Sequence, residues 1–254
     1  MIRRSVKERL KAGEFVIGTW CILPSPHISD ILARSGLDFQ IIDMEHGQIS
    51  PETMSGMAMA IGSQCETFVR VPNDDQNAIS HALDCGAAGV IVPHIESVKD
   101  RETAVAASKY PPLGSRGFSP FVRAEGYTSS AVDTNARNKE LLTGIMIEGK
   151  SGLENLDKII DDENIDLVYI GTYDLSVALG VPGEVNSQKV QSVLEDVVKR
   201  LRENGKAAGC MANDIAGIKK LKDMGVQFLL YKVDSSIIFD NARSAADGLK
   251  SMLR

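Results

Sequence analysis

Short apolar segments rich in β-branched residues recur along the chain, and each is followed by a polar or Gly/Pro break and then by a helical pattern. Eight segments predict strands, at 16–21, 39–45, 66–72, 89–95, 143–148, 167–172, 206–212 and 227–234. Helical patterns fill the intervals, at 27–36, 51–63, 75–85, 97–108, 152–163, 190–204, 214–224 and 236–253. Near-continuous apolar strands that alternate with amphipathic helices are typical of a parallel sheet covered by helices.

Eight strand–helix units in 254 residues predict an α/β fold in which one domain, 1–254, forms a closed (β/α)8 TIM barrel. A doubly wound open sheet is the structural alternative. The interval after the fourth strand is unusually long, and its excess, at about 110–138, contains YPPLGSRGFSPFVRAEGY. Such long loops are usually functional or disordered. The aromatic, Pro and Arg content predicts an ordered insertion, over the barrel mouth or at a subunit contact.

Composition and charge indicate a soluble globular protein. Apolar residues make up 43% and charged residues 24%, and the net charge is -6 with the basic residues spread out, which argues against nucleic acid and anionic membranes as partners. The polar N-terminus, Met1-Ile2-Arg3-Arg4, and the lack of a long apolar run predict a cytoplasmic location. Four dispersed cysteines without a CxxC pair predict reduced interior residues, at Cys21, Cys65, Cys85 and Cys210.

Ionisable residues gather where the predicted strands end. Barrel enzymes build their active sites at the carboxyl ends of the strands, and five consecutive strands supply candidates there. These are Asp43, Glu45 and His46; Arg70; His94; Glu148; and Asp174 within Gly171-Thr172-Tyr173-Asp174. The opposite rim begins with Phe39, Gly89, Thr143 and Leu167. This asymmetry predicts an enzyme.

Glu148 and Asp174 follow apolar runs on adjacent strands. Two carboxylates in this position suit a hard divalent cation such as Mg²⁺ or Mn²⁺, with coordination sites left for substrate oxygens and water. The alternative is structural: Asp174 caps the following helix and Glu148 is a partly exposed loop residue. The sequence GTYD also opens a helix, whose backbone N–H groups suit a carboxylate or phosphate.

Arg70 lies in the otherwise apolar strand ETFVRVP, where an unpaired guanidinium is costly to bury. Either it pairs with a barrel carboxylate for structural reasons, or it faces the mouth and binds an anionic oxygen. His46 is a candidate general acid or base with Asp43 orienting its ring. A histidine after a strand can equally be a simple loop donor, and His94 has the same two interpretations.

Several ordered motifs resemble those of the HpcH/HpaI family of metal-dependent (class II) pyruvate aldolases. They are DMEHG at 43–47, RVPNDD at 70–75, ALDCGAAGVIVPHIES at 82–97, YPPLGSRGFSP at 110–120, IEGKSGLENLDKI at 147–159 and YIGTYDLSVALG at 169–180. The resemblance implies a (β/α)8 barrel that cleaves 4-hydroxy-2-oxo acids reversibly to pyruvate and an aldehyde. It also implies a homohexamer in which neighbouring subunits exchange the last helix.

The resemblance further implies a role for each candidate residue. Glu148 and Asp174 would bind the divalent metal (Mg²⁺, Mn²⁺ or Co²⁺), which pyruvate would chelate through its carboxylate and keto oxygens. Arg70 would stabilise the enolate oxygen, and His46, oriented by Asp43, would handle the proton on the aldol hydroxyl. The remaining implied positions are Gly171, Thr172 and Tyr173, whose amides would hold the pyruvate carboxylate, and Trp20 and Asp84, near the site or the neighbouring subunit.

Two departures from the family pattern leave the acceptor open. Many relatives have Gln where this chain has Met146, and Pro where it has Thr172. Losing an amide beside the metal removes a group that orients water or substrate, so the acceptor or the reaction can differ, and Arg116 and Arg123 of the insertion could bind a carboxylated acceptor. Three other functions stay open: a citrate-synthase-like biosynthetic condensation, a Schiff-base aldolase using Lys232, and a non-catalytic barrel that binds a 2-oxo acid.

Overall fold

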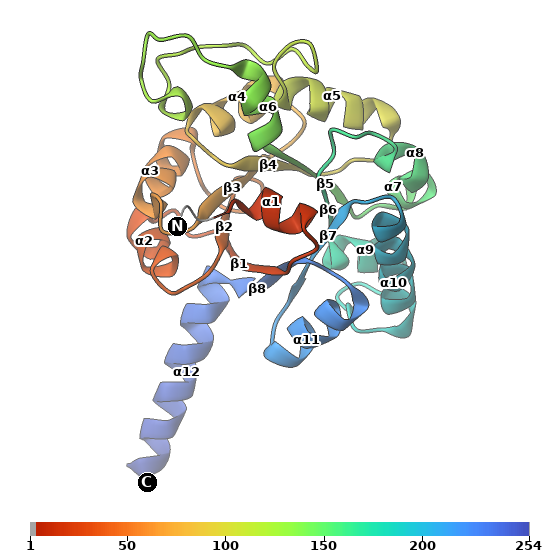
Figure 1. The fold of residues 1–254 in the computed structure, drawn as a ribbon. Coiled ribbons are helices and arrows are strands. Elements are labelled where there is room, and N and C mark those ends of the chain that lie inside the picture. Colours follow the sequence, from red (N-terminus) through yellow and green to blue (C-terminus); the bar gives the residue numbers. More distant parts are fainter. Residues whose placement is uncertain (1–3, 254) are drawn as a thin grey trace.

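The strands form a closed barrel in a computed structural model that describes residues 4–253 (Figure 1). All neighbouring strands pair in parallel in chain order, and β8 pairs with β1 to close the barrel. The strands are β1 Val16–Cys21, β2 Phe39–Asp43, β3 Glu66–Arg70, β4 Gly89–Val92, β5 Leu142–Ile147, β6 Leu167–Ile170, β7 Ala207–Ala212 and β8 Phe228–Val233. The predicted single-domain barrel is confirmed, and the open sheet is wrong. Met1–Arg3, used above to predict location, lie outside the described residues.

Helices cover the outside of the barrel between successive strands (Figure 1). They are α2 Pro26–Ala33, α3 Pro51–Ile61, α4 Gln76–Asp84, α5 Val98–Ser108, α7 Lys150–Glu154, α8 Leu156–Ile160, α9 Thr172–Ala178, α10 Gln188–Glu203 and α11 Ile215–Met224. The last helix, α12 Asp234–Met252, follows β8. Serine side chains accept a backbone N–H at the starts of α2, α3, α5 and α10, which satisfies a donor that has no partner within the helix.

Aromatic side chains fill the amino-terminal half of the barrel interior. The rings of Phe39 and Phe228 stack with centroids 3.9 Å apart, and Phe68 packs edge-on against both. Gly18 makes room for them, because a Cβ there would overlap the Phe39 ring. This aromatic cluster fills the amino-terminal half of the interior, and the polar side chains lie at the carboxyl ends of the strands.

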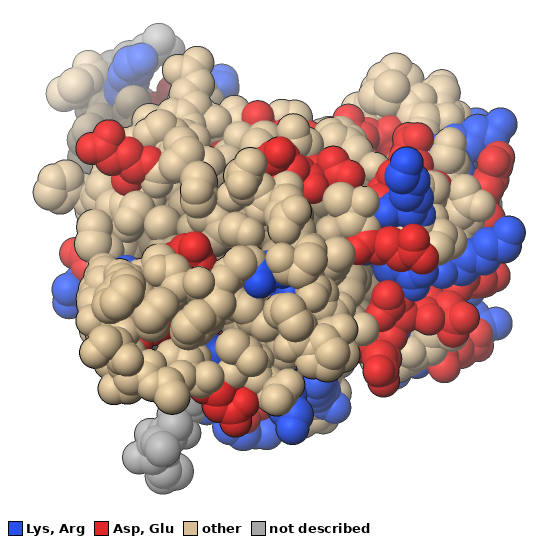
Figure 2. All heavy atoms as spheres, turned by 90° about the horizontal axis from the view of Figure 1, so that it is seen from above, with Lys and Arg blue, Asp and Glu red and all other residues tan. Residues whose placement is uncertain are grey.

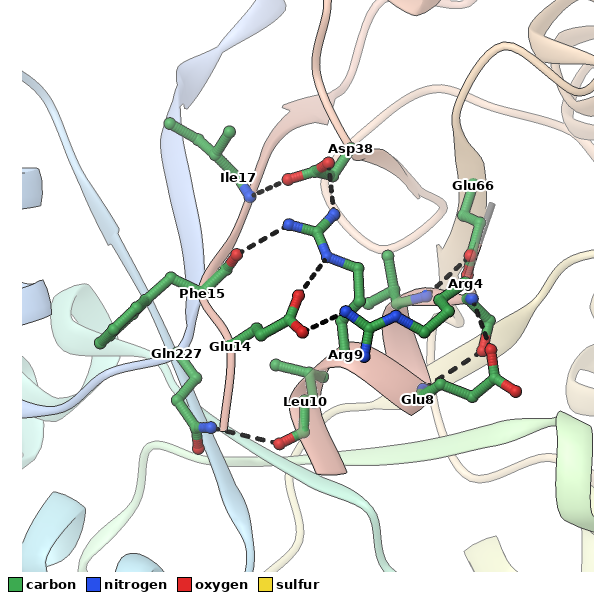
Figure 3. A network of polar contacts seen from close by, with 12 residues as sticks. Arg4, Glu8, Arg9, Leu10, Glu14, Phe15, Ile17, Asp38, Glu66 and Gln227 are labelled. Carbon is green, nitrogen blue, oxygen red and sulfur yellow. Dashed lines mark hydrogen bonds and ion pairs between the residues drawn. The ribbon is translucent and has the colours of Figure 1, made fainter. Parts of the chain in front are cut away.

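A short helix missed by the sequence analysis, α1 (Val6–Lys11), lies across the amino-terminal mouth of the barrel (Figure 1). Ser5 and Glu8 form a capping box at its start, so the sequence did contain a signal for it. Figure 3 shows how it is fastened: Arg9 binds Asp38 at 2.5 Å, and the Gln227 side chain donates to the Leu10 carbonyl at 3.2 Å.

The insertion contains a 3-10 turn, Arg123–Glu125, and a second missed helix, α6 (Thr134–Glu140). Its two ends are joined, because the Tyr110 N–H donates to Asn138 and the Asn138 amide donates back to the Tyr110 carbonyl. The insertion packs on the end of α4, where the Arg123 guanidinium donates to the Cys85 carbonyl at 2.9 Å.

The last helix, α12, extends away from the barrel (Figure 1). Asp234, at its start, accepts backbone N–H groups of Ile22 and Leu23, each at 3.1 Å. Beyond this anchor the helix leaves large apolar side chains exposed, among them Ile238, Phe239, Leu249 and Met252. Within the described residues, neither α12 nor any other helix is long and apolar enough to cross a membrane.

Candidate active site

A cavity of about 370 Å³ opens at the carboxyl ends of the strands. It is lined by Trp20, Ile22, Asp43, His46, Arg70, Met146, Tyr169, Gly171, Thr172, Tyr173, Asp174, Met211 and Val233. A second cavity, of about 230 Å³, shares Asp174 and adds His94, Glu148 and their neighbours. The structure therefore brings together the candidates from the strand ends, whereas Asp84, Arg116, Arg123 and Lys232 line neither cavity.

Arg70 forms the rigid centre of the first cavity. Its Nε and Nη2 atoms donate to the two Asp43 oxygens at 2.8 and 2.5 Å, and Nη1 lies 3.0 Å from Glu45 Oε2. The guanidinium carbon lies 4.5 Å from the centroid of a Trp20 ring. Burial lowers the pKa of the Arg70 guanidinium, but the hydrogen bonds and charge of Asp43, together with the nearby Glu45 and Tyr169, more than offset this and raise it. Arg70 is thus both paired inside the barrel and present at the cavity wall.

Asp43 fixes the backbone of the turn that follows β2. Its Oδ1 atom accepts the N–H groups of Glu45 and His46, at 3.0 and 3.2 Å. The His46 side chain is exposed and lines the cavity, and among the described residues its ring has no hydrogen bond to Asp43. The Asp43 oxygens accept hydrogen bonds from Arg70 and from these two backbone amides. Asp43 therefore positions the backbone of His46 and not its ring.

His94 contacts two carboxylates, those of Glu45 and Glu148. The sequence analysis assigned no role to Glu45. Its Nε2 lies 2.6 Å from Glu45 Oε1, and its Nδ1 lies 3.1 Å from Glu148 Oε1, which also accepts the His94 N–H at 3.0 Å. His94 holds this place with a positive φ of 57°. The signal for Glu45 was its presence in DMEHG, two residues after Asp43.

Glu148 and Asp174 line the smaller cavity together. Glu148 is only 5% exposed, and a Cβ at Gly171 would lie 2.5 Å from its Oε2 atom, so glycine is needed beside it. Asp174 lies in the first turn of α9, whose N-cap is Gly171 without a side-chain hydrogen bond. The two structural alternatives, a helix-capping Asp174 and a partly exposed Glu148, are therefore wrong.

Glu148 lies in a buried environment with other negative charges nearby. Burial raises the pKa of Glu148, the His94 N–H and charge oppose this, and the negative charges of Asp174 and Glu45 add to the rise. A divalent cation between Glu148 and Asp174 would offset that repulsion. Over residues 4–253, no group of three or more His, Cys, Asp or Glu side chains is arranged to hold a metal ion. Two carboxylates with open positions for substrate oxygens and water suit Mg²⁺ or Mn²⁺.

The other sequence candidates occupy defined places. Asp84 forms a 2.5 Å ion pair with the buried Arg116 of the insertion and does not line the cavity. The sulfur atom of Met146 lies 3.8 Å from Arg70 Nη1. Tyr169, which the sequence analysis missed because it sits inside an apolar strand, accepts a hydrogen bond from Trp20 Nε1 at 3.1 Å.

Comparison with known proteins assigns this barrel, with its rim of carboxylates, arginine and histidine, to the lyases of the aldolase type. Residues 16–239 match the family model described as HpcH/HpaI aldolase/citrate lyase, and the chain belongs to this family. Members of the family are generally dependent on a divalent metal.

Named relatives cover nearly the whole chain. It is 33% identical to a hydroxypyruvate/pyruvate aldolase of Pseudomonas aeruginosa, over 96% of this chain and 92% of that protein. It is 34% identical to a 2-keto-3-deoxy-L-rhamnonate aldolase of Klebsiella pneumoniae, over 93% and 90%. A crystal structure of a family member from Burkholderia cenocepacia matches with a TM-score of 0.92 at 26% identity, covering 96% of this chain and 98% of that one.

Proposed function

We propose that this protein is a class II pyruvate aldolase that reversibly cleaves a 4-hydroxy-2-oxo acid to pyruvate and an aldehyde. The observation that carries the proposal is the placement of the Arg70 cation on the cavity wall and of Glu148 and Asp174 at the adjoining cavity. The relatives named as aldolases of hydroxypyruvate and pyruvate and of 2-keto-3-deoxy-L-rhamnonate support 2-oxo acid chemistry.

Glu148 and Asp174 would hold the divalent cation, Mg²⁺, Mn²⁺ or Co²⁺. When bound, the cation supplies a Lewis acid for the negative charge that develops on the keto oxygen as the carbon–carbon bond breaks. The amides of Gly171, Thr172 and Tyr173 would orient the pyruvate carboxylate at the start of α9, where backbone N–H groups are unpaired.

Arg70 would supply a second, fixed cation for the same oxygen. Its plane is set by Asp43 and by the Trp20 ring, so little reorganisation is needed when charge develops. His46, at the exposed side of the cavity, would exchange the proton of the aldol hydroxyl. Trp20 and Met146 add an apolar wall beside Arg70, which would limit the access of water to this part of the site.

We also propose a homohexamer with exchanged last helices. Two exposed apolar surfaces support self-association. One is the side of α12 that carries Ile238 and Phe239. The other lies on the insertion, with Phe118, Phe121 and Tyr127 exposed; Figure 2 looks down on this side, and a broad part of it carries no Lys, Arg, Asp or Glu. Surfaces of this kind mark interaction sites. Asp84 and the insertion would then lie at subunit contacts.

The cytoplasmic location stays a prediction.

The Schiff-base alternative lacks support. Lys232 does not line the cavity; its amino group lies 2.5 Å from Asp240 of α12. The hydrogen bond to Asp240 raises the pKa of Lys232, whereas an imine-forming lysine needs a lowered pKa. The citrate-synthase-like condensation and the non-catalytic barrel use the same residues, so activity measurements must separate them from an aldolase.

The test is a pyruvate-release assay over a panel of 4-hydroxy-2-oxo acids, with the metal-stripped protein and with added Mg²⁺, Mn²⁺ or Co²⁺. We expect metal-dependent release of pyruvate together with an aldehyde. Binding of 2-oxo acids without turnover would favour the non-catalytic barrel. Full activity in excess chelator, after verified metal removal, would contradict the metal assignment.

A further inference from the structure

A second large cavity lies at the opposite end of the barrel from the candidate active site. Its volume is about 400 Å³, and it opens beside α1 at the amino-terminal ends of β5 to β8. Five cationic side chains line it, and the acidic side chains that line it are Glu163 and Asp166. The cations are Lys7, Lys11, Arg202, Lys206 and Lys222. Because the whole chain has a net charge of -6, this excess of positive charge is local.

Two of the cations are held in place by the barrel. Lys7 donates to Asp166 Oδ2 at 2.8 Å and to the Leu141 carbonyl at 2.7 Å. Lys206 donates to the carbonyls of Asp162 and Ile165 at 2.6 and 3.0 Å. An ammonium has three N–H donors, so Lys206 retains one for a further acceptor, whereas Lys7 also interacts with the Lys109 amino group.

Arg202 and Lys222 have no ion pair within the part of the chain that the structure describes. The Arg202 guanidinium packs over Gly225, where a φ of +103° ends α11. The Lys222 amino group lies 5.3 Å from the centroid of the Phe15 ring. Both side chains are exposed, so both can turn toward a bound anion.

Stabilisation of helix ends does not account for the clustering. Lys11, Arg202 and Lys222 lie in the last turns of α1, α10 and α11, where cations interact favourably with the helix dipole. The same dipole exists in α2, α3 and α5, which carry no basic residue in their last turns. Basic residues also end α6, α8 and α12, but those of α1, α10 and α11 converge on one cavity.

The apolar and backbone walls of the cavity are fixed before any ligand arrives. Leu10, Phe15 and Gln227 line it, and Figure 3 shows each of them in the network that fastens α1. Arg9 donates to the Phe15 carbonyl at 3.0 Å, and Gln227 donates to the Leu10 carbonyl at 3.2 Å. A preformed wall lowers the cost of ordering on binding.

We propose that this cavity binds a small polyanion of the phosphate-ester or diphosphate class. Its volume is within the range of small-molecule pockets. The planar fork of Arg202 and the point charges of the lysines match phosphoryl oxygens. This site is independent of the proposed aldolase activity, because none of its residues lines the carboxyl-end cavity.

The probe is inorganic pyrophosphate, titrated calorimetrically into metal-stripped protein at constant ionic strength. We expect saturable binding, and at least about tenfold weaker binding in the Arg202→Gln/Lys222→Gln variant, since charged hydrogen bonds are lost. The matched control is Lys199→Gln/Lys219→Gln, which removes the same charge from the same two helices outside the cavity and should bind like the wild type.

Lys11→Gln is a second test that carries little risk of unfolding, because this side chain is 67% exposed; it should also weaken binding. No saturable binding by the wild type, or equal affinity in the double variant, would overturn the proposal. Binding that Arg70→Lys abolishes and the double variant leaves unchanged would place pyrophosphate in the carboxyl-end cavity and would also overturn it.

Discussion

Arg70 and Asp43 meet through two parallel hydrogen bonds, from Nε to Oδ1 and from Nη2 to Oδ2, with both side chains almost fully buried. This fork fixes the plane of the guanidinium as well as its position. The same carboxylate also accepts a hydrogen bond from the His46 N–H. Asp43 therefore positions both the Arg70 guanidinium and the turn that carries His46.

Asp43→Asn should therefore destabilise the fold as well as impair activity. Removing one partner of a buried ion pair leaves an uncompensated charge, and we expect a loss of about 3 kcal/mol in the free energy of unfolding, measured by urea denaturation. Asp30→Asn breaks an exposed pair with Arg34 and should cost less than about 0.5 kcal/mol. Equal losses of stability in Asp43→Asn and Asp30→Asn would mean that another group neutralises the charge of Arg70.

Glu148→Gln and Asp174→Asn should each abolish metal-dependent turnover while the circular dichroism spectrum stays unchanged. A hard cation depends on anionic oxygen ligands, and each change neutralises one of the two. Glu154→Gln, an exposed change on α7, is the control and should behave like the wild type. Wild-type metal dependence in Glu148→Gln would show that the cation is held elsewhere.

His46→Ala should separate two activities. Cleavage of a 4-hydroxy-2-oxo acid needs proton transfer at the aldol hydroxyl, and losing a general acid or base costs about two to four orders of magnitude. Decarboxylation of oxaloacetate needs no such transfer and should be spared. His27→Ala, on the exposed surface of α2, is the control for both assays. If both activities fall equally, His46 maintains the site as a whole.

Lys109 should make stability depend on pH. It is 1% exposed and donates to the carbonyls of Asn138 and Leu141, and burial, with a smaller contribution from Lys7, lowers its pKa to about 8. Because this value is below that of the unfolded chain, the unfolded state binds more protons between about pH 8 and 10.5, and the free energy of unfolding rises with pH there.

The measurement compares the wild type with Lys109→Met by urea denaturation from pH 8 to pH 10. The difference in their free energies of unfolding should shift by about 2 kcal/mol in favour of the wild type as the pH rises. The exposed change Lys99→Met should give no such shift. A constant difference across this range would mean that Lys109 keeps an ordinary pKa.

The barrel was predictable because each strand is a near-continuous apolar run, buried from both sides as parallel strands are. Val168 and Ile170 of β6, for example, are fully buried against the helices. The helix α1 was not recognised because only six residues form it, too few for a periodic pattern. Its capping box was visible, but a local signal does not show where the helix docks.

The sequence predicted which residues lie at the strand ends, but it did not predict which of them contact one another. The sequence placed Asp43 three residues before His46, which suggested a hydrogen bond between them. In the barrel, Asp43 and Arg70 are register partners on β2 and β3, and this long-range pairing determines where the Asp43 oxygens point. The part played by Glu45 likewise depends on His94, which approaches it from another strand end.

The left-handed backbone at His94 has an evolutionary consequence. A β-carbon in this conformation costs on the order of 1–2 kcal/mol, and glycine would relieve that cost while removing the ring that connects Glu45 with Glu148. A population of variants selected only for heat resistance should therefore accumulate glycine at position 94. One selected for turnover should retain histidine, so the residue found there would report which demand had dominated its history.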